Sequence, residues 1–60
     1  MHTYRVRIRD PKGRCKVIDQ SHSQNCELTQ ELTREQYARY LKGEAMDLAD
    51  GHNIKLVNHV

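Results

Sequence analysis

Residues 3–19, TYRVRIRDPKGRCKVID, contain the pattern that decides the fold of this 60-residue chain. Between residues 3 and 9 the apolar side chains of Tyr4, Val6 and Ile8 alternate with arginine or threonine. A period of two with β-branched and aromatic residues is typical of a strand that is buried on one face only. The sequence therefore predicts a half-buried strand with a row of arginines on its other face.

The four residues that follow, Asp10-Pro11-Lys12-Gly13, predict a type I turn. Aspartate is favoured at the first position of this turn, proline at the second and glycine at the fourth, because proline presets φ and the aspartate carboxylate accepts backbone hydrogen bonds. Residues 14–19 then return to an extended pattern. The two segments together predict an antiparallel hairpin.

The expected register of this hairpin places Arg9 opposite Arg14 across the turn. Val6 then faces Val17, and Ile8 faces Cys15, so that one face is largely apolar, whereas a shift by one residue would mix polar and apolar side chains. The other face would carry a basic set that we treat as the candidate nucleic-acid-binding site: Arg5, Arg7, Arg9, Arg14 and Lys16. In this register like charges lie directly opposite each other, which destabilises a sheet.

The second half of the chain predicts a helix and a closing strand. Residues 20–25 are polar and indicate a loop, and a short third strand is expected at residues 26–29. Thr33 and Gln36 have the spacing of a capping box at a helix start. Apolar residues recur at three- and four-residue intervals up to Leu48, so the helix is expected to end near Gly51, with an earlier end at Gly43 as the alternative. Residues 54–57 then predict the final strand.

These elements define the expected fold class, which is α+β in a single domain spanning residues 1–60. The expected order is two strands in a hairpin, a short third strand, a helix and a closing strand, with the helix on the apolar face of a small antiparallel sheet. Only 37% of the residues are hydrophobic, and phenylalanine and tryptophan are absent. Such a chain builds one thin core, so we expect pairing with a second copy through the strand edge at residues 57–60 or through an exposed helix face.

The charge of the chain is unevenly distributed, although its formal net charge is only +2. Residues 1–20 contain six Lys or Arg and two Asp, which gives +4, and residues 21–60 contain four and six, which gives −2. No apolar stretch approaches the length of about 20 residues needed to cross a membrane, and the first residues lack the apolar segment of an export signal. With two cysteines, Cys15 and Cys26, the sequence favours a cytoplasmic protein with reduced thiols.

Two catalytic or metal-binding constellations are weaker candidates. The possible metal ligands are Cys15, His22, Cys26, His52 and His59. They lack the paired spacing of a zinc site, so neither a metal nor another cofactor is expected, and the cysteines are expected to be partly buried. Ser21-His22-Ser23 places a base beside two hydroxyls near Cys26, but a polar loop explains this stretch, and we expect a protein that is not an enzyme.

The arginine row favours a nucleic-acid-binding or regulatory function. Alternate residues on a strand lie about 6.6–6.8 Å apart, close to twice the axial rise of about 3.4 Å per phosphate along one nucleic-acid strand. The implied partner is the phosphate backbone of DNA or RNA. The alternative is a small adaptor or inhibitor that binds another protein, and a third explanation of the basic face is simple solvation of an outer strand surface.

Overall fold

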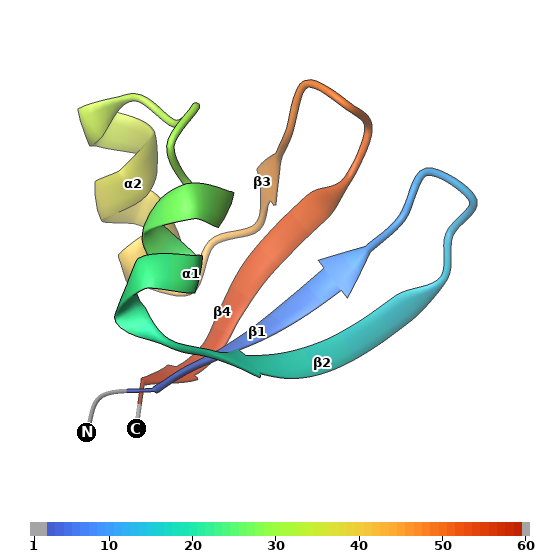
Figure 1. Ribbon diagram of the computed structural model, residues 1–60. Coiled ribbons are helices and arrows are strands. Elements are labelled where there is room, and N and C mark those ends of the chain that lie inside the picture. The colour runs from blue at the N-terminus through green and yellow to red at the C-terminus, as the bar shows by residue number, and fades with distance from the viewer. Residues whose placement is uncertain (1–2, 60) are drawn as a thin grey trace.

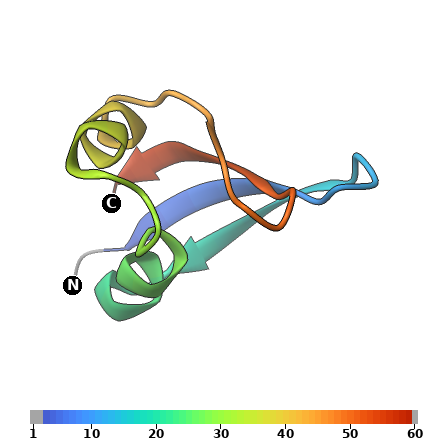
Figure 2. The same ribbon diagram turned by 90° about the horizontal axis from the view of Figure 1, so that it is seen from above.

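The computed structural model describes residues 3–59, with the side chains of residues 3–58. Four antiparallel strands form one sheet in the order β2-β1-β4-β3, and two helices pack on one side of it (Figures 1 and 2). The elements are β1 (Tyr4–Arg9), β2 (Cys15–Gln20), α1 (His22–Leu28), α2 (Arg34–Leu41), β3 (Met46–Asp47) and β4 (Asn53–His59). The predicted α+β class is confirmed, with an additional helix and a different place for the third strand.

The predicted hairpin is confirmed, but its register is wrong by one residue. The Asp10 N–H donates to the Arg14 carbonyl at 2.8 Å, the Gly13 N–H donates to the Asp10 carbonyl at 2.9 Å, and Gly13 has φ of 90°. The turn is therefore type I, followed by a left-handed glycine that adds one residue to the loop. Because Asp10, and not Arg9, lies opposite Arg14, every residue of β1 pairs with the β2 residue one position later than expected.

The observed cross-strand pairs therefore differ from the expected ones. Arg7 lies opposite Val17, Arg9 opposite Cys15, and Ile8 opposite Lys16. Lys16 lies on the helix side of the sheet, near its hairpin end, where its side chain stays exposed. The alternation of apolar residues argued against pairing Ile8 with Lys16. This pairing is nevertheless accommodated, because the helices do not cover the hairpin end of the sheet and Lys16 remains in contact with water there (Figure 1).

The expected loop and third strand over residues 20–29 are wrong, because this segment forms α1. Ser21 caps the helix: its hydroxyl accepts from the Gln24 N–H at 3.2 Å, and the Gln24 side chain accepts from the Ser21 N–H at 2.8 Å. This capping box has the same spacing as the one at Thr33 and Gln36, which is confirmed at the start of α2. Gln20, expected in the loop, is the buried last residue of β2.

Helix α2 ends earlier than its predicted end near Gly51. It stops at Leu41, with Lys42 as its C-cap, and Gly43 has φ of 96°. A glycine in this left-handed conformation is a common helix terminator, and here it turns the chain toward β3. Gly51 instead lies between β3 and β4, and the predicted closing strand is confirmed within β4.

The core lies between the sheet and the two helices. Its buried apolar residues are Tyr4, Val6, Tyr40, Ile54 and Leu56. α1 contributes a polar residue, Asn25, whose side-chain oxygen accepts from the Tyr40 hydroxyl at 2.9 Å. The strand edge expected at residues 57–60 lies within β4 as far as His59, and Val60 lies outside the described residues.

Candidate nucleic-acid interface

The side of the sheet opposite the helices has no covering element among residues 3–59 (Figure 1). Val6, Ile54 and Leu56 point into the core, so their strand neighbours project to the other side. We call this side the open face. It is formed by Arg5, Arg7, Arg9, Cys15, Val17, Asp19, Asp47, Asn53, Lys55, Val57 and Asn58. The β1–β4 register shifts between Arg5 and Val6, so that Asn58 is the partner of Arg5 and Val57 has no partner on β1.

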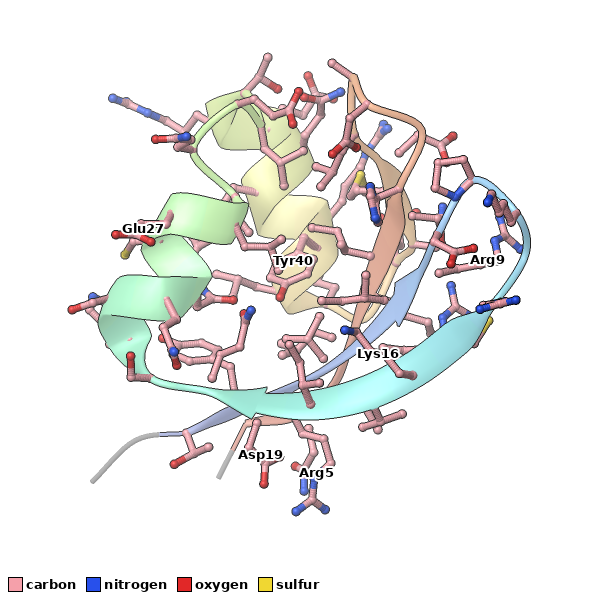
Figure 3. All side chains as sticks on the ribbon, turned by 45° about the vertical axis from the view of Figure 1, so that its right-hand side comes forward. Arg5, Arg9, Lys16, Asp19, Glu27 and Tyr40 are labelled. Carbon is pink, nitrogen blue, oxygen red and sulfur yellow. The ribbon has the colours of Figure 1, made fainter. Side chains whose placement is uncertain are left out.

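Arg5 is the one arginine of the row that forms an ion pair within the open face. Its Nε donates to Asp19 Oδ1 at 3.0 Å, and the two residues are also cross-strand partners. The hydrogen bond and the charge of Asp19 raise the pKa of Arg5. Figure 3 shows both side chains projecting away from the helices. Both are about half exposed, so the pair is accessible to water and its contribution to stability is small.

Arg7 is held by a chain of hydrogen bonds that reaches the short strand β3. Its Nη2 donates to Asn53 Oδ1 at 2.6 Å, and Asn53 Nδ2 donates to Asp47 Oδ1 at 2.8 Å. Asn53 is buried, and the Nε of Arg7 is buried without a hydrogen-bond partner. The guanidinium therefore has a fixed position along the sheet and retains donor capacity.

Arg9 and Lys55 are the unpaired cations of the open face. Both are exposed, and neither forms an ion pair with any residue in the described part of the chain. Lys55 is the cross-strand partner of Arg7 on β4, so its side chain projects to the same side. Sequence reasoning missed Lys55, although its position between Ile54 and Leu56, both of which face the core, is a period-two signal.

The predicted basic set is divided between the two sides of the sheet. Arg5, Arg7 and Arg9 lie on the open face, whereas Arg14 and Lys16 line a hollow of about 210 Å³ together with Ile8 and His52. The like-charge pairs expected between Arg9 and Arg14 and between Arg7 and Lys16 are not formed. The added residue of the turn explains this result, because it moves every even-numbered residue of β2 to the helix side.

The open face combines four cations with two carboxylates. The cations are Arg5, Arg7, Arg9 and Lys55, and the carboxylates are Asp19 and Asp47, which gives a formal charge of +2. No tyrosine belongs to the open face: Tyr4 and Tyr40 are buried in the core, and Tyr37 lies half-buried on α2. The face therefore offers charge and hydrogen-bond donors, but no aromatic platform on which bases stack.

The cysteines are free and exposed, so the predicted partial burial is wrong. Cys15 lies on the open face, and Cys26 lies on α1 with its Sγ 3.6 Å from His22 Nε2. The other ring nitrogen of His22, Nδ1, lies 3.3 Å from the Tyr4 hydroxyl. Within the described residues no group of three or more His, Cys, Asp or Glu is placed to hold a metal ion, and the side chain of His59 lies outside them.

Comparison of the chain with protein-family models, curated proteins and solved structures found no match. The chain is therefore described by its own architecture, which is an antiparallel sheet with two helices on one side and a basic open face on the other. None of the described helices has the length and apolar character required to cross a lipid bilayer.

Proposed function

We propose that the open face binds the phosphate backbone of nucleic acid. The observation that carries this proposal is the pair Arg9 and Lys55, two exposed cations without acidic partners on the face that already holds Arg5 and Arg7. Unpaired cations that share one surface raise the local potential and attract polyanions. The two helices support the sheet from behind and leave the open face accessible (Figure 1).

The geometry of the sheet favours contacts along a backbone. Arg5, Arg7 and Arg9 follow β1 at intervals of about 6.6–6.8 Å, which is close to two phosphate steps on one strand. Arg7 is already oriented by Asn53, so it loses little freedom when it engages an oxygen. Because the open face lacks aromatic rings, we expect binding by charge with little sequence preference.

Fluorescence anisotropy with labelled mixed-sequence duplex and single strands, over a series of salt concentrations, tests this proposal. For duplex DNA, the logarithm of affinity should fall with the logarithm of salt by about 0.9 for each phosphate engaged. Arg9→Ala and Lys55→Ala should each reduce this slope by about one unit. Arg34→Ala is the matched control, because it removes an exposed, unpaired charge from α2, behind the sheet. Equal effects of all three variants, or no binding by the wild type at about 50 mM salt, would refute the proposal.

A second candidate function, docking of another protein, is supported by two apolar residues on the same face. Val17 and Val57 are each 54% exposed, and they flank the arginine row from β2 and β4. An interface of this type buries an apolar centre, so its affinity should depend only weakly on salt. The salt series therefore separates the two functions.

A further inference from the structure

Strand β2 forms one edge of the sheet, with no neighbour on its outer side among residues 3–59. The Asp10–Arg14 hydrogen bond fixes which backbone groups of β2 are free. Hydrogen-bonded pairs alternate along an antiparallel ladder, so Lys16, Ile18 and Gln20 direct their N–H and C=O groups to β1. The same groups of Cys15, Val17 and Asp19 point outward.

We propose that a second copy of this chain pairs with the β2 edge, strand β2 against strand β2, about a twofold axis at Val17. One register engages all three outward-pointing residues of both copies. In it Val17 faces Val17 of the second copy, and Cys15 faces Asp19 of the second copy. Residues paired on antiparallel strands project to the same side, so the two open faces become one continuous surface.

Side chains on both sides of the sheet are complementary in this register. On the open face the two copies of Val17, each 54% exposed in the single chain, come into contact. On the helix side Lys16 of the second copy lies beside Ile18. A hollow of about 380 Å³ is present at that place, lined by Ile18, Asp19, Gln20, Gln24, Glu27 and Leu28. The hollow is thus positioned to receive the lysine.

Charge supports the same pairing. The aliphatic stem of Lys16 from the second copy would lie on Ile18 and Leu28, with its ammonium group directed to Glu27. Neither Lys16 nor Glu27 forms an ion pair within the described chain. The twofold axis generates this contact twice, so the register leaves neither lysine opposite a like charge.

The other edge of the sheet is less suited to this pairing. There β3 pairs with β4 at Asn53 and Ile54. Gly43 lies against the backbone at Leu56, because a Cβ added to this glycine would lie 4.0 Å from the Leu56 carbonyl oxygen. Edge strands without protection are common sites of intermolecular pairing. The second copy therefore belongs at β2 and not at the C-terminal strand.

A charge exchange tests the predicted contact. By sedimentation equilibrium, Lys16→Glu and Glu27→Lys should each weaken the dimer by about tenfold, and the double variant should restore it to about the wild-type dissociation constant. Lys12→Glu, which makes the same change in the exposed turn, should have little effect. Circular dichroism monitors the fold of each variant. A wild-type species that remains at 7.1 kDa at all concentrations up to the millimolar range, or a double variant that is not restored, would overturn the proposal.

Disulfide trapping tests the position of the twofold axis. In a background where Cys15 and Cys26 are serine, Val17→Cys should form a cross-linked dimer under mild oxidation, because directly opposed Cα atoms lie about 5.5 Å apart, within the range of a disulfide. Val57→Cys is the matched control, since the two valines have equal exposure on the same face. Equal cross-linking of both variants would refute the register. Neither measurement involves nucleic acid, so this proposal and the proposed function fail independently.

Discussion

At the residue scale, the charge of the open face available for binding depends on which of its cations form hydrogen bonds or ion pairs within the chain. Asn53 connects Arg7 to Asp47, and Asp19 holds Arg5, while Arg9 and Lys55 remain unpaired. The three arginines could be predicted from alternation alone. The exclusion of Arg14 and Lys16 could not, because it depends on the φ angle of a single residue, Gly13.

Burial in the core changes the pKa of the Tyr40 hydroxyl, which makes the stability of the fold dependent on pH. Burial raises its pKa to about 12 from 10.0, because the phenolate would be charged inside the core. Between pH 10 and about pH 12, the hydroxyl of Tyr40 therefore remains protonated in the folded state but is ionised in the unfolded chain. The associated stability is complete below pH 10 and is lost as the pH rises toward 12. Denaturant titrations at pH 9, 10 and 11 should show a fall in unfolding free energy that Tyr40→Phe reduces, and identical pH profiles of the two proteins would contradict this assignment.

At the scale of elements, local signals predicted the hairpin, the start of α2 and the final strand. α1 could not be found from hydrophobic period, because its only buried residue is the polar Asn25. The capping pair Ser21 and Gln24 was the available signal. β3 comprises two residues and depends on β4 for its pairing, so no sequence period specifies it. The end of α2 depends on Gly43, since the helical apolar pattern continues beyond it.

The cap of α1 yields a test of this short helix. Ser21→Ala removes the hydroxyl that accepts from the Gln24 N–H, and we expect a loss of about 1 kcal/mol in unfolding free energy. Ser23→Ala, two residues later in the same helix, should be neutral or slightly stabilising, because alanine is the better helix former. Urea denaturation measures both variants. An equal response to the two substitutions would show that the capping box does not stabilise α1.

At the scale of the whole molecule, a thin core supports a sheet whose other side faces water. The core between the sheet and the helices buries five apolar residues, four from the sheet and Tyr40 from α2. On the open face, Lys55 lies directly opposite Arg7. Like charges in that arrangement destabilise a sheet by a fraction of a kcal/mol. Proteins retain destabilising residues chiefly at functional sites. The Arg7–Lys55 pair therefore fits the binding role that we propose for the open face.

This arrangement predicts opposite effects of salt on folding and on binding. Salt screens the repulsion between Lys55 and Arg7 and should raise the unfolding free energy, while the same salt displaces a bound polyanion. Lys55→Gln should therefore stabilise the fold by about 0.2–1 kcal/mol at low salt and reduce its salt dependence. Lys12→Gln, in the exposed turn between β1 and β2, is the control and should do neither. Urea denaturation at low and high salt, combined with anisotropy on the same variants, measures both effects. If Lys55→Gln destabilised the fold and left affinity unchanged, Lys55 would be a structural residue, and the open face would lose one of its two unpaired cations.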